Sequence, residues 1–238
     1  IVPWNVPLMI AMWKIAPALA TGCTIVIKPS EVTPLATLRL AELAVDAGIP
    51  AGVINVVNGF GAEAGQALVE HPLVSKISFT GSAVTGKAIN RAATETLKNV
   101  TLELGGKSPV ILLDDANLNK AVQGISMGIF GNTGQVCVAG SRLYIQRGIF
   151  DKAVDRLTKE ARSLKVGPGL HPETKIGPLV SEAHRDKVMG LIKAGVKSGG
   201  EAVTGGAMID GPGYYVEPTV LVNPPQSSQV VQEEIFGP

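Results

Sequence analysis

Short runs of β-branched and apolar residues alternate along the chain with longer segments in which apolar positions recur at helical spacing. The short runs predict strands at 24–27, 53–57, 76–80, 100–104, 109–113 and 142–146, and near Ala202 and Thr219. The longer segments predict helices at 7–19, 34–47, from Gly61 to about 70, from Ser82 to about 97, and at 117–129, 150–164 and 181–197. Thr33 is expected to cap the second of these helices, with Pro34 in the first helical position.

This alternation of strands and helices predicts right-handed crossovers and a parallel sheet, and therefore an α/β fold. Gly105 and Gly106 close the fourth strand, and a second series of strands and helices starts near Lys107. A chain of 238 residues is long enough for two modest domains. We therefore expect two domains, at 1–106 and 107–238.

Composition and charge argue against several classes of protein. Apolar residues make up 45% of the chain and charged residues 17%, which permits a sizeable buried core. The net charge of +1 gives no electrostatic footprint for nucleic acid or for an anionic membrane. The apolar run at 8–12 is too short for a membrane span. The histidines share no metal-ligand spacing, so no metal site is expected; they are His71, His171 and His184.

The two cysteines lie far apart in the sequence, which suits a reducing, cytoplasmic location better than a disulfide framework. Cys137 lies in the Gly-rich polar segment FGNTGQVCVAGSR, between an expected helix and an expected strand. A cysteine in such a loop is a candidate nucleophile, because a thiolate attacks carbonyl carbons well. Its alternative is a small buried residue kept for packing, and packing is the role expected for Cys23.

Polar groups at the ends of the expected strands are candidates for ligand binding, because ligands bind beyond the carboxyl ends of parallel strands. Gly81 and Ser82 precede a helix whose first N–H groups could hold a pyrophosphate, or they form only a tight turn and cap. The fingerprint GxGxxG is absent. Lys28 and Glu31 could bind ribose hydroxyls, and the alternative for Glu31 is a solvated capping carboxylate.

Two further residues could carry chemistry. Glu103 follows an apolar run and is expected at a buried strand end, where a raised pKa would suit a general base. The alternative is a buried carboxylate that is hydrogen-bonded to the backbone. Asn5 offers an amide that could stabilise an oxyanion or cap a helix, and Trp4 could wall a cleft or lie in the core.

Six motifs in order and in register resemble the aldehyde dehydrogenase superfamily over the whole chain. They are PWN at 3–5, KPSE at 28–31, FTGS at 79–82, ELGGK at 103–107, GQVC at 134–137 and EEIFGP at 233–238. The resemblance implies part of a Rossmann-like, parallel-sheet NAD-binding domain at 1–106 and part of an α/β catalytic domain at 107–238. Family members are about twice as long, so the chain resembles their central segment.

The resemblance also implies residue roles in the oxidation of an aldehyde to a carboxylic acid with NAD. Cys137 is the expected nucleophile, which forms a thiohemiacetal and then a thioester, and Asn5 holds the oxyanion. Glu103 is the expected general base, and Lys14 matches a lysine linked to proton relay, with a surface helix lysine as its alternative. The expected cofactor contacts are Val2, Pro3, Trp4, Asn5, Lys28, Ser30, Glu31, Gly61, Gly81, Ser82, Leu104, Gly105, Lys187, Glu234 and Phe236.

Alternatives within the resemblance concern cofactor and reaction type. Glu31 favours NAD over NADP, and Glu103 favours hydrolysis of the thioester over transfer to coenzyme A. A catalytically silent structural or binding relative is a further alternative. The expected partners are a small-molecule aldehyde and, in a homo-dimer or homo-tetramer, further copies of the protein. Phe130 and the neighbours of Cys137, Val136 and Val138, are expected to border the aldehyde and favour an apolar or aromatic substrate.

Overall fold

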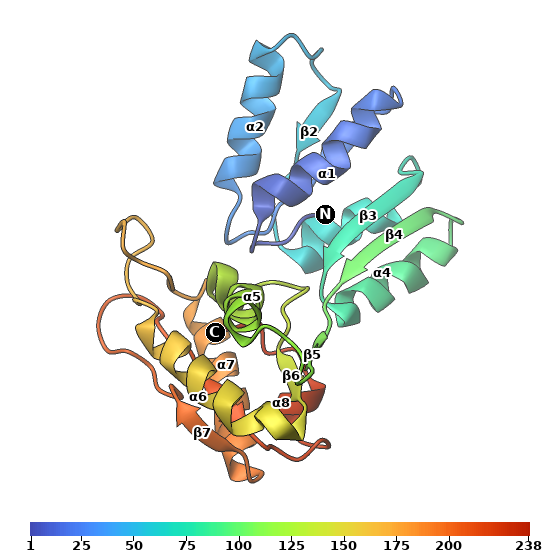
Figure 1. Ribbon diagram of the computed structural model, residues 1–238. Helices are drawn as coiled ribbons and strands as arrows, with labels where there is room; N and C mark the ends of the chain where they lie inside the picture. Colours follow the sequence, from blue (N-terminus) through green and yellow to red (C-terminus); the bar gives the residue numbers. More distant parts are fainter. The chain divides into compact units, whose positions relative to one another are not determined.

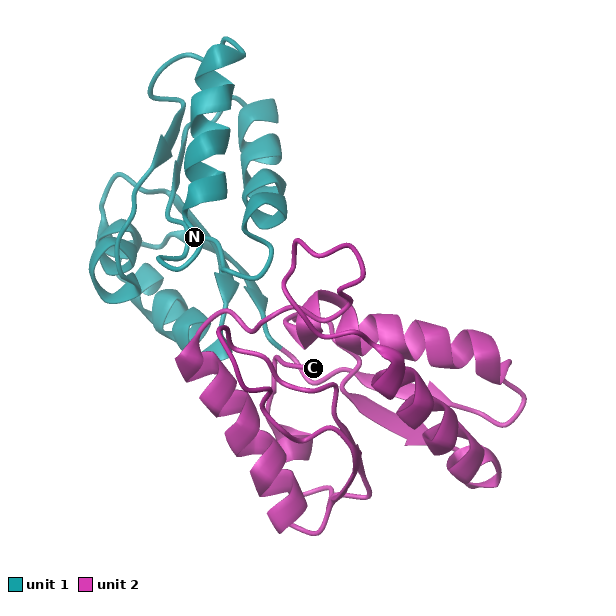
Figure 2. Cartoon of the chain, turned by 90° about the vertical axis from the view of Figure 1, so that its left-hand side faces the viewer, with its two compact units in different colours: residues 1–105 teal, residues 106–238 magenta.

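A computed structural model describes residues 1–238. The chain forms two compact units, Ile1–Gly105 and Gly106–Pro238, coloured separately in Figure 2. The unit boundary lies one residue before the domain boundary expected from the sequence.

The first unit consists of short parallel strands and the helices that connect them (Figure 1). Its elements are α1 (Pro7–Ala20), β1 (Ile25–Ile27), α2 (Leu35–Asp46), β2 (Ile54–Val56), the π-helical turn η1 (Gly61–Gly65), α3 (Gln66–Glu70), β3 (Lys76–Gly81), α4 (Ala83–Thr94) and β4 (Asn99–Leu104). β1 pairs with β2 and β3 pairs with β4, both in parallel, which confirms the expected α/β pairing.

The first residues of the chain connect the two strand pairs of this unit. The Val2 amide donates to the Lys28 carbonyl just beyond β1 at 3.0 Å. The Ile1 nitrogen donates to the Ser78 carbonyl in β3 at 2.8 Å, and the Thr80 amide donates back to the Ile1 carbonyl at 3.2 Å. Ile1 and Val2 therefore bridge β1 and β3, and buried Val2 joins the apolar cluster under α1.

The second unit combines a parallel and an antiparallel strand pair with longer helices. Its elements are β5 (Pro109–Leu112), α5 (Leu118–Phe130), the 3-10 turn η2 (Gly131–Gly134), β6 (Arg142–Ile145), the 3-10 turn η3 (Arg147–Ile149), α6 (Phe150–Ser163), α7 (Glu182–Lys197), β7 (Glu201–Thr204), β8 (Val220–Val222) and α8 (Gln229–Gln232). β5 and β6 pair in parallel, and β7 and β8 pair antiparallel. Three short elements lack a counterpart among the expected ones: the single-turn helix α8 and the 3-10 turns η2 and η3.

Two element ends differ from the sequence expectation. α2 begins at Leu35, and the Pro34 carbonyl accepts from the Thr37 and Leu38 amides. Thr33 belongs instead to the preceding turn, where its amide donates to the Ser30 carbonyl at 3.2 Å, so its predicted capping role is wrong. α4 ends at Thr94, and Leu97 adopts a φ of 54° that takes the chain out of the helix.

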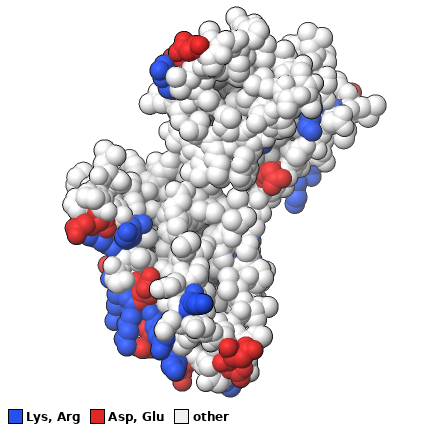
Figure 3. Space-filling model, turned by 45° about the horizontal axis from the view of Figure 1, so that its top comes forward, with Lys and Arg blue, Asp and Glu red and all other residues white.

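Surface charge of both signs is mixed in this chain. Acidic and basic side chains lie side by side on the face shown in Figure 3. The ion pair between Lys159 and Asp155, one turn apart on α6 at 2.8 Å, is an example. No helix of the structure combines the length and the apolar character needed to cross a membrane.

Candidate active site

The segment after β1 contains the first pair of expected cofactor residues. Lys28 is buried, and its Nζ donates to the Pro29 carbonyl at 2.9 Å and lies 3.5 Å from the Glu31 carboxylate. The stem of Lys28 also lies against Gly65 of η1. The buried lysine therefore holds Glu31, whose side chain is 45% exposed, at the carboxyl end of a parallel strand.

The N-terminus of α4 lies at the end of β3 and is open to solvent. The Ser82 hydroxyl accepts from the Thr85 amide at 3.2 Å, which makes Ser82 the N-cap. Ser82 therefore has the capping role that was expected as the alternative to pyrophosphate binding. As at every helix N-terminus, the first amides of α4 have no hydrogen-bond partners inside the helix. Those amides are suited to an anionic ligand.

Gly86 on α4 was not among the expected site residues, although it ends the sequence FTGSAVTG. A β-carbon at Gly86 would lie 2.6 Å from Leu104 of β4. Glycine here allows α4 to pack directly on the strand, which is the close packing that a glycine provides in dinucleotide-binding folds. The helix N-terminus is thereby fixed at the strand ends.

Lys14 on α1 is half-buried and reaches β3. Its Nζ donates to the hydroxyls of Ser78 at 2.9 Å and Thr80 at 3.0 Å. Burial lowers the pKa of Lys14, and the nearby charge of Glu103 partly opposes this shift. The alternative of an ordinary surface lysine is therefore wrong.

Glu103 is exposed, so the expectation of a buried carboxylate is wrong. β4 alternates in burial, and Val100, Leu102 and Leu104 pack on the apolar cluster below the strand. Glu103 lies between Leu102 and Leu104, so its side chain points to the opposite face of the strand. The apolar residues before Glu103 do pack in the core, but they lie on one face of β4 and Glu103 lies on the other.

Two other expectations from the first unit have clear outcomes. Cys23 is exposed rather than packed in the core, because it follows the end of α1 in an open turn; the Thr21 hydroxyl lies 3.6 Å from its sulfur. Asn5 lies half-buried in the bend before α1. α1 begins with Val6 as N-cap and without a side-chain cap, so Asn5 does not act as the helix cap.

In the second unit, Cys137 is half-buried with a free thiol in the loop between η2 and β6. Two buried side chains brace the segment before it. The Thr133 hydroxyl accepts from the Gly177 amide at 3.0 Å, and the Gln135 side-chain oxygen accepts from the Val180 amide at 3.0 Å. The segment 177–180 thus fixes the cysteine loop from a distant part of the sequence.

Gly134 brings the GQVC and EEIFGP motifs into backbone contact. Gly134 has a φ of 71°, and a β-carbon there would overlap the backbone of Gly237. Gly106 of the ELGGK motif lies beside the Cys137 carbonyl, and its amide donates to the Glu234 carboxylate at 3.2 Å. Three motifs that are far apart in the sequence therefore meet around Cys137.

Phe236 and His184 form a contact that the sequence did not anticipate. Phe236 has a φ of 63°, a left-handed conformation that costs an L-residue roughly 1–2 kcal/mol. His184 of α7 lies with Nε2 2.7 Å from the Phe236 carbonyl, and the two rings meet edge to face. Burial lowers the pKa of His184, the Phe236 carbonyl raises it, and Lys187 lowers it further. In the sequence, His184 stands out only as one of three histidines that share no metal-ligand spacing.

Lys107 and Arg142 were not among the expected site residues. The Lys107 amine and the Arg142 Nε are buried without hydrogen-bond partners. Burial and the Arg142 charge lower the pKa of Lys107 to about 8, and Glu234 opposes the shift. Lys107 therefore interacts electrostatically with both the Arg142 guanidinium and the Glu234 carboxylate.

The other expected cofactor residues lie at several places on the two units. Buried Ser30 lies in the segment after β1, and Gly61 begins η1. Leu104 is the last residue of β4, and Gly105 follows it. Pro3 and Trp4 precede α1 and are half-buried. Lys187 is exposed on α7, one turn after His184. No three or more His, Cys, Asp or Glu side chains gather closely enough to hold a metal ion.

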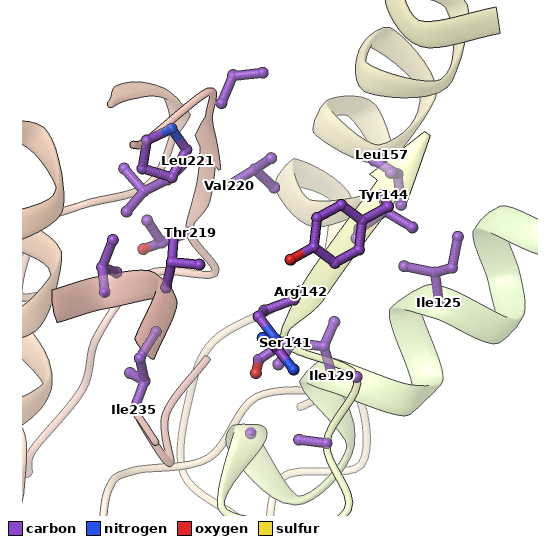
Figure 4. Close-up of a pocket in the computed structure, with 18 of the residues that line it drawn as sticks. Ile125, Ile129, Ser141, Arg142, Tyr144, Leu157, Thr219, Val220, Leu221 and Ile235 are labelled. Carbon is purple, nitrogen blue, oxygen red and sulfur yellow. The ribbon is translucent and has the colours of Figure 1, made fainter. Parts of the chain in front are cut away.

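An apolar groove of about 560 Å³ lies in the second unit, and Val136 and Ala139 of the cysteine loop are among the residues that line it. Figure 4 shows Arg142 and Tyr144 from β6 on one side and Val220 and Leu221 from β8 on the other. Phe130 also lines this groove but is only 6% exposed and packs against Ala161 and Ile176. Phe130 therefore has a role in the apolar core, which competes with its expected role beside the substrate.

Parallel strand pairs covered by helices, with a braced cysteine loop in one unit, define a class of α/β protein with a cysteine site. The chain belongs to the aldehyde dehydrogenase family, which it matches over residues 1–238. It is 54% identical to DhaS of Bacillus subtilis, provisionally named an aldehyde dehydrogenase, and 48% identical to phenylacetaldehyde dehydrogenase of Pseudomonas fluorescens. Each match covers 100% of this chain and 48% of the relative.

Solved structures give the same result for the fold. The NAD+ complex of an aldehyde dehydrogenase from Bacillus cereus matches with a TM-score of 0.97 at 50% identity, over 99% of this chain and 48% of that protein. The expected aldehyde dehydrogenase-like α/β fold is therefore confirmed. The chain spans about half the length of the curated relatives that it matches.

Proposed function

We propose that this chain carries the central part of an NAD-dependent aldehyde dehydrogenase, which oxidises an aldehyde to a carboxylic acid. The observation that carries the proposal is the cysteine loop: Gly134 packs on Gly237, buried Thr133 and Gln135 brace the loop, and the Cys137 thiol remains partly accessible. Pre-organisation of this kind suits a nucleophile that attacks a bound carbonyl.

In the proposed first step, the Cys137 thiolate attacks the aldehyde carbon, a C–S bond forms and the carbonyl oxygen becomes an oxyanion. The Asn5 amide and the Cys137 backbone N–H are assigned to this oxyanion as hydrogen-bond donors. Bound NAD supplies the hydride acceptor that converts the thiohemiacetal into a thioester.

The residues present fit a dinucleotide. The open N-terminus of α4 at Gly81 and Ser82 suits a pyrophosphate, and the Lys28–Glu31 pair, with Ser30, suits ribose hydroxyls. Glu234 and Phe236 are assigned to the nicotinamide ribose and ring. The remaining contacts are assigned to Val2, Pro3, Trp4, Gly61, Leu104, Gly105 and Lys187. Glu31 supports NAD over NADP because its carboxylate repels a 2′-phosphate.

In the final step, water attacks the thioester, its proton passes to Glu103, the C–S bond breaks and the Cys137 thiolate is restored. The exposed carboxylate of Glu103 is accessible to water. Lys14 is assigned to proton relay, which its lowered pKa and its electrostatic interaction with Glu103 support.

We also propose that the protein is cytoplasmic and assembles into a homo-dimer or homo-tetramer. Two free cysteines, one of them exposed, suit a reducing compartment. Size-exclusion chromatography with light scattering on the protein with its gene-encoded flanks would test the assembly.

The test of the activity is the absorbance of NADH formed from NAD and a panel of aldehydes, with Cys137→Ala beside the unsubstituted protein. We expect NADH only from the protein that retains Cys137. Glu103→Gln is expected to form about one NADH per site and then to stall, because acylation precedes the water step. No NADH from a folded protein that binds NAD would contradict the proposal, and NADH formation that requires coenzyme A would identify the acylating reaction instead.

A further inference from the structure

His184 is fixed on α7 by its own helix terminus. Its amide donates to the hydroxyl of Ser181, the N-cap of α7, at 3.2 Å. The His184 side chain leaves the first turn of the helix and ends 2.7 Å from the Phe236 carbonyl. Because a carbonyl oxygen only accepts hydrogen bonds, Nε2 of His184 carries the hydrogen and donates it.

The hydrogen bond acts on a residue that needs support. Phe236 has a φ of 63°, a conformation that a bulky L-residue adopts only where its surroundings impose it. The next residue, Gly237, lies so close to α7 that a β-carbon there would approach Val188 to 2.7 Å. α7 therefore holds this part of EEIFGP through one polar contact at Phe236 and one close packing contact at Gly237.

The ring of Phe236 is held by the same histidine. The two ring centroids lie 6.1 Å apart with an interplanar angle of 72°, an edge-to-face arrangement. The His184 side chain thus contacts both the backbone and the ring of Phe236. Burial and the charge of Lys187 lower the pKa of His184 and so favour its neutral form near neutral pH.

We propose that His184 is a positioning residue that holds the backbone and ring of Phe236 in the orientation needed to contact the nicotinamide ring. This inference rests on the proposed function for the role of Phe236. In the proposed role, His184 itself touches no reacting atom. Its hydrogen bond selects the left-handed conformation of Phe236, and loss of the donor frees the Phe236 peptide to rotate and the ring to leave its place.

The test compares three variants of the protein with its gene-encoded flanks. His184→Phe keeps a planar ring and removes the donor. His184→Gln keeps an N–H donor at a similar distance from the backbone. His171→Phe, at an exposed histidine elsewhere in the same unit, controls for the substitution itself. The measurements are thermal unfolding, the Kd for NAD by calorimetry, and kcat and KM for NAD and for the aldehyde.

We expect His184→Phe to raise the Kd and KM for NAD about tenfold, the equivalent of one lost buried hydrogen bond, with the KM for the aldehyde unchanged. His184→Gln and His171→Phe are expected to stay within about twofold of the unsubstituted protein. A crystal structure of His184→Phe is expected to show Phe236 outside the left-handed region. If His184→Phe does not fold, His184→Leu serves as the donor-free variant.

Two results would overturn the inference: an unchanged Kd for NAD in the donor-free variant, or equal losses in that variant and in His184→Gln. Failure of the proposed function is distinguishable from these results. An unsubstituted protein that binds NAD and forms no NADH counts against the function, whereas the Kd comparison among variants still decides the role of His184. An unsubstituted protein that does not bind NAD overturns both.

Discussion

Three consecutive residues before the proposed nucleophile adopt left-handed backbone conformations. The φ angles are 49° at Asn132, 60° at Thr133 and 71° at Gly134. The conformation at Thr133 is the most unusual, because β-branched residues avoid this region, and strain of this kind costs roughly 1–3 kcal/mol. The hydrogen bonds between Thr133 and Gly177 offset part of that cost. The loop is thus held by contacts that only the folded chain provides.

Gly134→Ala is expected to destabilise the protein by roughly 2–3 kcal/mol, because the new methyl group overlaps the Gly237 backbone at a positive φ. Displacement of the loop by about 1 Å is expected to lower kcat/KM by roughly 100-fold. Urea unfolding and NADH formation measure the two effects. Gly131→Ala is the matched control, because nothing lies within 4 Å of a β-carbon there. Equal effects of the two substitutions would contradict the proposed contact.

Lys107 gives the protein a pH-dependent stability. Its pKa is about 8 in the folded protein against an ordinary value of 10.5, so the unfolded chain binds more protons between these values. Partly buried Lys107 destabilises the folded protein fully below pH 8, and this destabilisation is relieved as the pH rises to 10.5.

Lys107→Met is therefore expected to stabilise the protein by roughly 1–2 kcal/mol at pH 7, a figure discounted for residual solvent exposure. The gain should shrink between pH 8 and pH 10.5. Urea unfolding at a series of pH values measures it. Lys152→Met, at an exposed lysine on α6, should change stability little at any pH. A gain that is independent of pH would show that packing rather than charge is responsible.

At the scale of elements, α4 shows how the sequence of a helix fixes its N-terminus beside the end of a strand. Ser82 caps its start, Gly86 allows it to touch Leu104, and Ile89 and Ala93 continue the buried face. The cap and the proposed pyrophosphate site occupy the same turn. Stability and cofactor affinity should therefore respond differently to the charge of the residue at position 82.

Ser82→Ala is expected to lower stability by about 1 kcal/mol through loss of the cap. Ser82→Asp keeps a capping oxygen, so stability should be retained. Its negative charge at the helix start should nevertheless weaken NAD binding about tenfold or more by repulsion of the pyrophosphate. Thermal unfolding and NAD calorimetry separate the two effects. Unchanged NAD affinity in Ser82→Asp would place the pyrophosphate elsewhere.

At the scale of the whole molecule, the chain leaves an apolar face of α1 exposed. Ile10, Ala11 and Ile15 are buried on one side of the helix. The side chains exposed on the other side are apolar, with Trp13 at 62%; they are Leu8, Met9, Met12 and Trp13. With a net charge of only +1, such a surface favours association.

We expect the 238-residue chain to self-associate as its concentration rises. Met9→Lys combined with Trp13→Lys should reduce that association without loss of the fold, as light scattering and circular dichroism would show. Asn90→Lys combined with Thr96→Lys adds the same charge at exposed polar positions and is the control. Equal improvement from both pairs would mean that net charge, rather than the α1 face, governs the association.

Local pattern determined much of this protein by itself. Apolar spacing and β-branched runs located the strands and all α-helices except α8, because neighbouring residues decide which backbone geometry is favourable. The motifs located Cys137 in a loop and the helix start at Ser82, since glycine and capping residues act within a few positions. They also identified the family.

Tertiary packing decided what local pattern could not. Glu103 lies on the exposed face of β4 and Cys23 in an open turn, because burial depends on which elements pack against each face. The support of the cysteine loop by Gly177, Val180 and Gly237 joins segments that are far apart in the sequence, as the Thr133–Gly177 separation of 44 residues illustrates. The pairing of His184 with Phe236 arises in the same way, since contacts between distant segments leave no periodic trace in the sequence.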